Sequence, residues 1–325
     1  MGVIDQWSDR LPVGPDTPNV SLGEGGTPLV RSDRLSTKLG VELWFKCEGL
    51  NPTGSFKDRG MAVAVAKALE DGAQGIVCAS TGNTAASAAA YAARAGIPAV
   101  VLTPVGAIAP PKVAQARAAG ARVLEVRGSF DEALRSCQEL AGRGDFALVN
   151  SLNPNRIEGQ KTAAFEVIEQ LGHVPDVLAL PYGGGGNTCA YAKGFDEEGA
   201  EVRLVLGQAA DRAHTVASAI RIAEPAHELQ VNALIEAHRA DIVAIKDEEI
   251  TGAWLEIASR EGIFCEPSSA AGFAALAHVA LVPGTTVVCV LTGHGLKDTA
   301  AVDVLTAPTI VVEPTLEAIL AQVSR

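Results

Sequence analysis

The sequence predicts an α/β fold in which parallel-rich, twisted sheets are flanked by helices. Short apolar runs alternate with Ala-rich helical stretches along most of the chain, and this order is typical of parallel strands joined by crossover helices. The 325 residues are 48% hydrophobic, so they can bury a large core and fit either two domains or one large α/β unit.

Seven apolar runs predict the strands. Each run has the length of a buried strand and is bounded by Gly, Pro or polar turn residues. In chain order the predicted strands are 41–47, 75–80, 98–104, 121–128, 176–181, 203–208 and 285–292.

Eight other stretches predict the helices. Prolines open the stretch at residue 110, Ser129 can cap the next one, and a glycine follows several others. The segment from Ala209 to Ala244 gives no clear pattern. In chain order the predicted helices are 55–73, 83–96, 110–120, 129–144, 156–172, 186–195, 247–262 and 268–280.

The composition argues against several classes of partner. A net charge of −12 disfavours nucleic acid or an anionic membrane, so an anionic substrate must be held by local donors. No run reaches the ~18 apolar residues of a membrane span, and the N-terminus lacks the apolar core of a signal peptide. Six scattered cysteines without a C-x-x-C pair predict buried thiols in a reducing cytoplasm and no metal site.

Three loops that follow predicted strands offer small hydrogen-bonding residues, and ligands of parallel sheets bind at such strand ends. The loop ASTGNT, 79–84, can hold a carboxylate, although ordinary helix capping would need one of its residues alone. The loop PYGGGGNT, 181–188, can form a phosphate-binding nest, with a flexible turn as the alternative. In LTGHG, 291–295, Thr292 can offer a hydroxyl to a ring heteroatom, and His294 is interpreted as structural.

Lys57 lies in NPTGSFKDRG, residues 51–60, where a turn that resists helix formation leads into a helix. A lysine at a helix entrance can be an ordinary surface residue. Alternatively, its amine can form a Schiff base with a carbonyl cofactor such as pyridoxal phosphate. That cofactor needs a lysine, a phosphate nest and a partner for its ring nitrogen, and the chain offers a candidate for each. Ser55 is expected to cap the helix, and Phe56 to direct Lys57 toward the cofactor.

Five motifs in order along the chain carry a family resemblance: NPTGSFKDRG, ASTGNTAASAAAYAARAG, VNSLNPNRIEGQKTAAFE, REGIFCEPSSAA and LTGHGLKD. Together they resemble the threonine synthase family, whose members are pyridoxal phosphate enzymes of the tryptophan synthase β-like fold, also called fold type II. The resemblance runs from about Ser21 to Leu206 and returns from about Asp247 to Asp298. It implies an active site between two domains, and it implies a homodimer. The large cofactor-binding domain would comprise 1–58 and 160–325, and the smaller, mobile α/β domain 59–159.

The resemblance implies a set of residues that hold the cofactor. Lys57 would be the Schiff-base lysine and proton shuttle, Asn83 would hydrogen-bond the ring hydroxyl, and Thr292 would face the pyridine nitrogen. A neutral hydroxyl at that nitrogen does not enforce ring protonation, which favours elimination and replacement over transamination. The cofactor phosphate would lie in a cradle formed by Gly183, Gly184, Gly185, Gly186 and Asn187.

The resemblance also implies O-phospho-L-homoserine as the substrate and L-threonine as the product. Phosphate would leave by γ-elimination and water would add at Cβ, with Lys57 removing a proton from Cα and later one from Cβ. Ser80, Thr81 and neighbouring backbone amides would hold the substrate carboxylate, and Thr84 would be a further substrate-binding residue.

Three residues are implied to bind the substrate phosphate: Asn150, Ser151 and Arg156. From the residues alone, Arg156 is interpreted instead as a helix-start arginine paired with Glu158 or a nearby acid. The matching motif makes the phosphate role the better interpretation.

Two departures from the family pattern leave other activities open. The phosphate loop reads GGGGN where the family is closer to GNAGN, and the segment after Gln208 is shorter, with Glu-Pro in place of Asn-Pro. The enzyme alternatives are a serine/threonine dehydratase and a β-replacement enzyme such as a cysteate synthase. A non-catalytic relative that binds a partner is a third alternative, against which the intact Lys57 argues.

Overall fold

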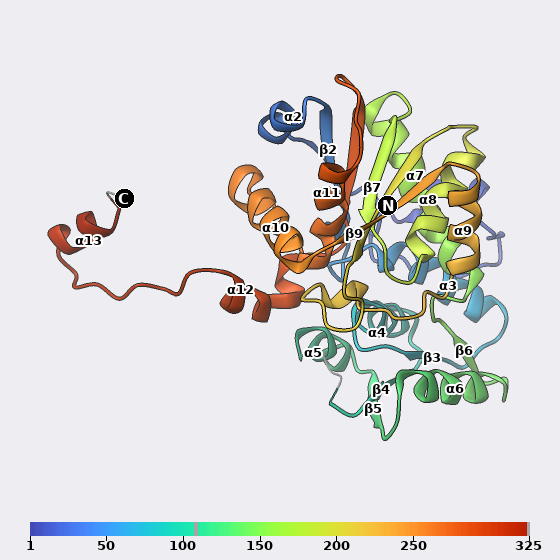
Figure 1. Ribbon diagram of the computed structural model, residues 1–325. Helices are drawn as coiled ribbons and strands as arrows, with labels where there is room; N and C mark the ends of the chain where they lie inside the picture. The colour runs from blue at the N-terminus through green and yellow to red at the C-terminus, as the bar shows by residue number, and fades with distance from the viewer. Residues whose placement is uncertain (107–109, 324–325) are drawn as a thin grey trace.

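The structure, a computed structural model, describes residues 1–106 and 110–323 and contains two separate sheets (Figure 1). The larger sheet has six strands in the order β1-β2-β10-β7-β8-β9. All neighbouring strands within it run parallel, except that the edge strand β1 pairs antiparallel with β2. Its strands are β1 Leu29–Arg31, β2 Glu42–Cys47, β7 Val177–Pro181, β8 Arg203–Ala209, β9 Ala240–Ile245 and β10 Thr286–Leu291.

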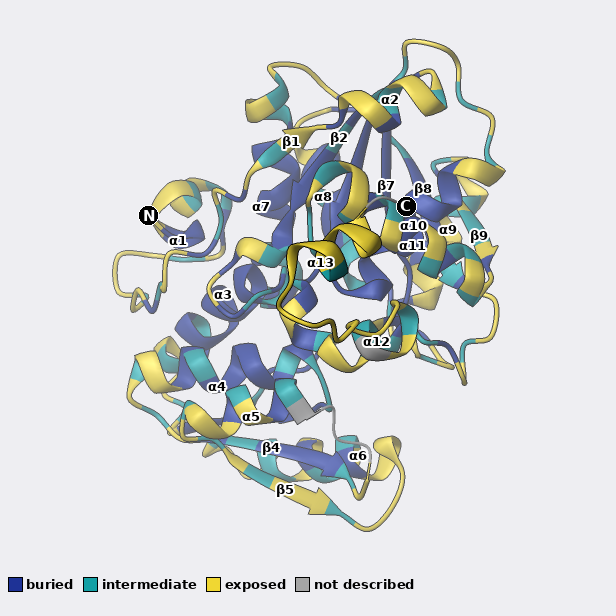
Figure 2. Ribbon diagram, turned by 90° about the vertical axis from the view of Figure 1, so that its left-hand side faces the viewer, coloured by how far each residue is buried: buried dark blue, intermediate teal, exposed yellow. Residues whose placement is uncertain are grey.

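The smaller sheet has four strands, all parallel, in the order β5-β4-β3-β6. Its inner strand β3 is fully buried. The edge strand β5 is largely exposed, as Figure 2 shows. Its strands are β3 Gly75–Ala79, β4 Ala99–Pro104, β5 Arg122–Val126 and β6 Phe146–Leu148.

Helices cover both faces of each sheet and also connect the two sheets (Figure 1). The α-helices are α1 Val3–Trp7, α2 Asp33–Leu39, α3 Lys57–Glu70, α4 Asn83–Ala95, α5 Pro110–Ala118, α6 Phe130–Ala141, α7 Pro154–Leu171, α8 Gly186–Glu197, α9 Glu228–Glu236, α10 Asp247–Glu261, α11 Ala271–Ala275, α12 Thr299–Leu305 and α13 Leu316–Val323. The 3-10 helices are η1 Ser8–Arg10, η2 Glu48–Leu50, η3 Ser218–Ile220, η4 Pro267–Ala270, η5 Leu276–His278 and η6 Gly295–Asp298.

Alternate residues of the large sheet face two different apolar layers. Val287 of β10 packs in one layer with side chains of α2, α10 and α11, whereas its neighbour Val288 packs in the other with α7 and α8. This alternation follows from the two-residue period of a strand. It explains why the central strands read as unbroken apolar runs, since both faces are buried.

The seven predicted strands are all present, and the two-sheet α/β architecture is as expected. The predicted cap of α6 is confirmed, because Ser129 Oγ accepts a hydrogen bond from the N–H of Glu132 at 3.2 Å. The helix predicted at 268–280 is instead broken into η4, α11 and η5. The segment without a clear pattern forms α9 and edge strand β9, neither of which the sequence indicated.

A buried ionic network ties the start of α3 to the rest of the large unit. The guanidinium of Arg59 donates to both carboxylate oxygens of Glu48, at 2.7 and 2.8 Å, and to both oxygens of Glu166, each at 2.6 Å. Lys46 donates to the same Glu166 at 2.8 Å. Burial alone would raise the pKa of Glu166, but the charge and hydrogen bonds of Arg59 lower it to about 2. The network is therefore ionised, and it fixes a residue two positions after Lys57.

Helices α3 and α7 cross in backbone contact at two glycines. A Cβ added to Gly159 would lie 2.1 Å from the carbonyl oxygen of Arg59. A Cβ added to Gly60 would lie 2.5 Å from the carbonyl oxygen of Arg156. Since each contact is with backbone that cannot swing away, both positions require glycine. The crossing brings the first turns of the two helices, which carry Lys57 and Arg156, into one place.

We expect Gly159→Ala to destabilise the protein by about 3 kcal/mol or more, because the added methyl group must force the two helices apart. Gly252→Ala is the matched control, since Gly252 lies within α10 and a Cβ there would meet nothing within 4 Å. Alanine at that position should stabilise the protein by roughly 0.5–1 kcal/mol. Urea unfolding of the two variants measures both values. A Gly159→Ala variant as stable as the parent protein would contradict the close crossing.

Candidate active site

Lys57 is the first residue of α3, and the turn before it is attached to the end of β10. The N–H of Phe56 donates to the carbonyl of Thr292 at 3.0 Å, and the N–H of His294 donates to the carbonyl of Gly54 at 2.9 Å. These bonds hold the turn against the LTGHG loop, so the lysine and Thr292 lie at the same strand end. Two predicted site residues far apart in sequence are therefore neighbours.

The expected cap by Ser55 is wrong. The N-cap residue of α3 is Phe56, which makes no side-chain cap, and the N–H of Asp58 instead donates to the backbone carbonyl of Ser55. The hydroxyl oxygen of Ser55 is buried without a partner in the described chain. A buried polar atom without a partner is uncommon, and such an atom two residues before Lys57 can accept a hydrogen bond from a ligand or donate one to it.

The amine of Lys57 makes no hydrogen bond or ion pair with any described residue, and it lies 4.3 Å from the ring centre of Phe56. Its side chain is half-buried. Burial and, to a smaller extent, the positive charge of Arg156 lower the pKa of Lys57, the negative charge of Glu266 opposes them, and the resulting pKa is about 7. A lysine in this environment holds a nucleophilic amine near neutral pH.

The glycine loop joins β7 to α8 and presents a row of free backbone donors. Within the described residues, the backbone N–H groups of 183–188 donate no hydrogen bond. Asn187 Nδ2 and Thr188 Oγ1 are buried and also lack partners. Gly185 has a φ of 83°, a conformation that favours glycine. So many free donors at a helix N-terminus suit a phosphate group.

Thr292, at the end of β10, has a hydroxyl partner. Its Oγ1 lies 3.0 Å from Ser269 Oγ, and Ser269 also accepts from the N–H of Gly293 at 3.0 Å. The pair is buried and neutral. His294 has a structural bond, since its Nδ1 accepts from the N–H of Leu296 at 3.2 Å.

Asn83, the first residue of α4, is held by a buried carboxylate. Its Nδ2 donates to Glu266 at 2.7 Å, and Glu266 forms an ion pair with Lys112 at 2.6 Å. Because an ionised carboxylate accepts hydrogen bonds and donates none, this contact fixes which way the amide of Asn83 points. The carbonyl Oδ1 of Asn83 is left buried without a partner in the described residues.

The STGN loop takes part in helix capping as well as in the site. Ser80 Oγ accepts from the N–H groups of Gly82, at 3.1 Å, and Ala85, at 3.3 Å. Ordinary helix capping is therefore present, as the sequence left open. The hydroxyl proton of Ser80 is still able to donate to a ligand. Thr81 and Thr84 are half-buried at the same helix start and make no side-chain hydrogen bond with described residues.

The three residues implied to bind substrate phosphate differ in what they contact. The amide of Asn150 makes two bonds with the backbone of Ala79, at 3.0 and 2.8 Å, so it joins its loop to the end of β3. Ser151 is half-buried, and its side chain makes no hydrogen bond with the described residues. Arg156 is 1% exposed and donates through NH1 to the carbonyl of Val149 at 3.1 Å.

Among the described residues Arg156 has no acidic partner, which excludes the alternative of an ion pair with Glu158. The carboxylate of Glu158 contacts Lys161 and Lys193 instead. Nε and NH2 of Arg156 are buried without acceptors in the described residues. Burial lowers the pKa of Arg156 to about 10, so the guanidinium stays charged at neutral pH. A buried cation with free donors can bind an anion.

Comparison with known proteins identifies the family. The chain matches the family described as pyridoxal-phosphate dependent enzyme over residues 20–293. It is 48% identical to a threonine synthase of Bacillus sp. (strain ULM1), over 91% of this chain and 90% of that protein. It is 46% identical to a threonine synthase of Mycobacterium tuberculosis (strain ATCC 25618 / H37Rv), over 96% and 94%. The chain belongs to the threonine synthase family.

The structure comparison agrees with this family at the level of the fold. The O-acetyl serine sulfhydrylase isoform 3 of Entamoeba histolytica superposes with a TM-score of 0.78 at 21% identity, over 92% of this chain and 96% of that chain. The predicted fold class and the predicted dependence on pyridoxal phosphate are thus confirmed for the threonine synthase family to which the chain belongs.

The residues present fit pyridoxal phosphate. An unpaired lysine, a cradle of free N–H groups and a neutral hydroxyl pair lie at neighbouring strand ends. The orphaned atoms Asn83 Oδ1, Asn187 Nδ2 and Thr188 Oγ1 supply further polar contacts. Which of them touches which atom of the cofactor stays a prediction, as do the individual roles of the substrate residues.

Several site residues were missed by the sequence reasoning, among them Glu266, Lys112 and Lys297. Glu266 and Lys297 lie within motifs that carry the family resemblance, so the signal was present but gave no role. Lys297 donates to the carbonyl of Thr53 and to Gln115, both at 2.6 Å, and thereby fastens α5 to the turn that precedes Lys57. Thr188 was also missed, because the predicted phosphate-binding residues ended at Asn187, one position before it.

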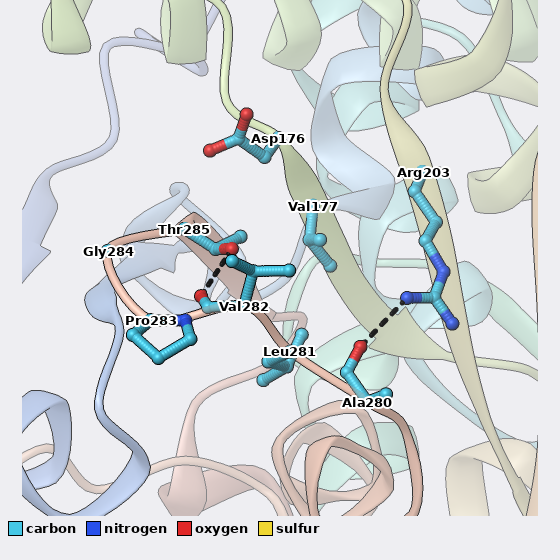
Figure 3. Close-up of a pocket in the computed structure, with 9 residues that line it drawn as sticks. All are labelled: Asp176, Val177, Arg203, Ala280, Leu281, Val282, Pro283, Gly284 and Thr285. Carbon is cyan, nitrogen blue, oxygen red and sulfur yellow. Dashed lines mark hydrogen bonds between the residues drawn. The ribbon is translucent and has the colours of Figure 1, made fainter.

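A groove of about 490 Å³ lies at the end of the large sheet opposite to Lys57, where β7 and β8 begin (Figure 3). It is lined by Val177 and Arg203, which begin β7 and β8, and by residues 280–285. Arg203 donates to the carbonyl of Ala280 across it at 3.1 Å. Since ligands of parallel sheets bind at the carboxyl ends of strands, this groove is not the candidate active site.

We expect the rate at which the apoenzyme captures pyridoxal phosphate to rise with pH and to level off just above pH 7. The neutral amine is the nucleophile, so its concentration rises through the pKa of Lys57, which is lowered to about 7. An ordinary lysine would keep gaining reactivity up to about pH 10. Growth of the visible absorption band in stopped-flow measurements gives the rate, with a free lysine derivative as control. A rate still climbing above pH 9 would contradict the lowered pKa.

Proposed function

We propose that the chain converts O-phospho-L-homoserine and water into L-threonine and phosphate. Membership of the threonine synthase family supports the reaction class, since the relatives carry that name. The observation that supports a phosphorylated substrate is that Arg156 is buried and has unpaired donors within the described chain. The free backbone donors of 183–188 would take the cofactor phosphate, so a buried cation elsewhere with free donors suits a second phosphate, on the substrate.

The substrate phosphate would bind Arg156 through Nε and NH2, the two donors that the chain leaves free. Guanidinium–phosphate contacts of this kind are charge-assisted and directional. Because the site is buried, the bond gains strength from the low local dielectric constant. A substrate without phosphate, such as serine or threonine, would leave this cation unpaired.

Lys57 would hold and move protons, first from Cα and later from Cβ of the substrate. When bound, pyridoxal phosphate supplies an electron sink for the carbanion that proton removal creates. The amine suits this role because burial brings its pKa to about 7, close to working pH. In the net change the Cγ–O bond breaks and phosphate leaves, a proton takes its place at Cγ, and the hydroxyl of water replaces the hydrogen that Lys57 removes from Cβ.

The polar residues around Lys57 would orient the reacting groups. Ser80, Thr81 and Thr84, at the N-terminus of α4, would hold the substrate carboxylate, because a helix start favours an anion. The neutral pair Thr292–Ser269 would contact the ring nitrogen without forcing its protonation. This environment suits elimination and replacement chemistry.

The chain is proposed to form a large domain, 1–58 and 160–325, and a small mobile domain, 59–159. Residues 107–109, 324 and 325 of these ranges lie outside the described chain. The two separate sheets support this division. A homodimer is supported by the extended C-terminal segment, whose α13 lies away from the body and exposes Leu316 and Val323 (Figure 1).

The cytoplasm is the proposed compartment. All six cysteines are free, and five are buried, which suits a reducing environment. No helix in the described part of the chain is long and apolar enough to cross a membrane. A group of His, Cys, Asp or Glu side chains that could hold a metal ion is likewise missing from those residues.

We expect Arg156→Met to lower kcat/KM for O-phospho-L-homoserine by about 100-fold or more, because two charge-assisted hydrogen bonds are lost. The same variant should be as stable as the parent protein or more stable, since it removes an unpaired buried charge. Threonine and phosphate release measure the first effect, and urea unfolding measures the second.

Arg203→Met is the matched control, because Arg203 lies at the opposite end of the sheet and should leave turnover unchanged. Serine, threonine and phosphoserine are assayed in parallel. Holoenzyme that produces 2-oxobutyrate from threonine and no threonine from O-phospho-L-homoserine would overturn the proposal in favour of a dehydratase. In that case Arg156→Met would barely change the rate.

A further inference from the structure

The two departures from the family pattern meet in space. Each glycine of the GGGG run lies against the segment between Gln208 and Lys246. A Cβ on Gly183 would lie 3.1 Å from the backbone of Ile220, and one on Gly184 would lie 3.6 Å from Ile222. A Cβ on Gly185 would lie 3.0 Å from the Cβ of His227. The glycine run and the altered segment are therefore one packed unit.

His227, the N-cap residue of α9, contacts the glycine loop with both its backbone and its ring. Its N–H donates to the carbonyl of Gly184 at 3.1 Å. A Cβ on Gly186 would lie 3.5 Å from two atoms of its imidazole, Cδ2 and Nε2. The residue is 9% exposed, so this packing is largely shielded from water.

The same ring reaches the loop that carries the predicted substrate-phosphate residues. Nε2 of His227 lies 3.0 Å from the carbonyl oxygen of Ser151. A carbonyl can only accept, so Nε2 carries the hydrogen and donates it. Ser151 is at the corner of a turn closed by the bond from the N–H of Asn153 to the carbonyl of Asn150, at 3.0 Å. His227 therefore fastens this corner to the glycine loop.

We propose that His227 is a positioning residue that holds the Asn150–Ser151 turn against the glycine loop and thereby sets the specificity for a phosphorylated substrate. The inference rests on the proposed function, in which that turn and Arg156 receive the substrate phosphate. His227 acts through the backbone of Ser151 and does not touch the reacting atoms. Ile157, which follows Arg156, also packs near Gly186, so a displaced turn would disturb the start of α7 as well.

Three variants separate the hydrogen bond of His227 from its packing. His227→Gln keeps a donor of similar reach, His227→Phe keeps a ring against Gly186 but loses the donor, and His227→Ala loses both. His278→Gln is the control, since His278 pairs with exposed Glu249 far from the site. The holoenzyme is assayed for kcat and KM with O-phospho-L-homoserine, and for its dissociation constant for inorganic phosphate by the change in its visible spectrum.

We expect His227→Phe to raise KM and the dissociation constant for inorganic phosphate about five- to tenfold, with kcat changed less than about threefold, because one hydrogen bond is lost. His227→Gln should restore both constants to within about twofold of the parent values. His227→Ala should match the phenylalanine variant in both constants and also release pyridoxal phosphate more readily on dilution. It serves as the donor-free variant if His227→Phe does not fold.

Equal phosphate affinity in the parent, glutamine and donor-free variants would overturn the inference. So would a glutamine variant as impaired as the donor-free ones, since that would mean a general loss of packing. Failure of the proposed function is seen separately, in parent enzyme that makes no threonine. Even then the binding of inorganic phosphate decides the role of His227, because that measurement requires no turnover.

Discussion

The fully satisfied guanidinium of Arg59 is the constraint on which the site depends. It is buried, and two carboxylates and two threonine hydroxyls accept all its hydrogen bonds, from η2, α7 and the segment before β1. Removing one partner of such a network costs about 3–5 kcal/mol, so the first turn of α3 has little freedom. Lys57, two residues earlier, is held at the end of β10 by this anchor. The fold thus supports a lysine amine that has no ionic partner of its own in the described chain.

The second buried arginine, Arg156, behaves in the opposite way. It lies one helix crossing away from Arg59, yet it keeps two donors without acceptors. An unpaired buried cation lowers stability, and proteins keep such groups at functional sites. Arg59, with all its donors paired, thus belongs to the supporting framework, whereas Arg156, with free donors, belongs to the proposed binding site. Loops with small polar groups follow β3, β7 and β10, and the loop after β10 holds the turn before Lys57, as expected for a site at the strand ends of a parallel α/β fold.

The sequence predicted those parts of the site whose chemistry is local. Lys57 and the glycine run could be recognised because a turn, a helix start and free backbone donors are encoded within a few residues. Asn150 illustrates the limit, since its amide bonds to Ala79, which is distant in sequence. Glu266 and His227 gain their roles through contacts with α4 and the glycine loop, and nothing beside them in the sequence reveals those contacts. Ser55 was mispredicted because backbone capping replaced its side chain.

The most direct test of the account is a crystal structure of the holoenzyme with the unreactive phosphonate analogue of O-phospho-L-homoserine. The account predicts that Nε and NH2 of Arg156 lie within hydrogen-bond distance of phosphonate oxygens, while Glu158 stays paired with Lys161 and Lys193. The glycine loop should hold the cofactor phosphate in the same crystal. A phosphonate bound away from Arg156, or an Arg156 that pairs with a protein carboxylate, would contradict the central claim.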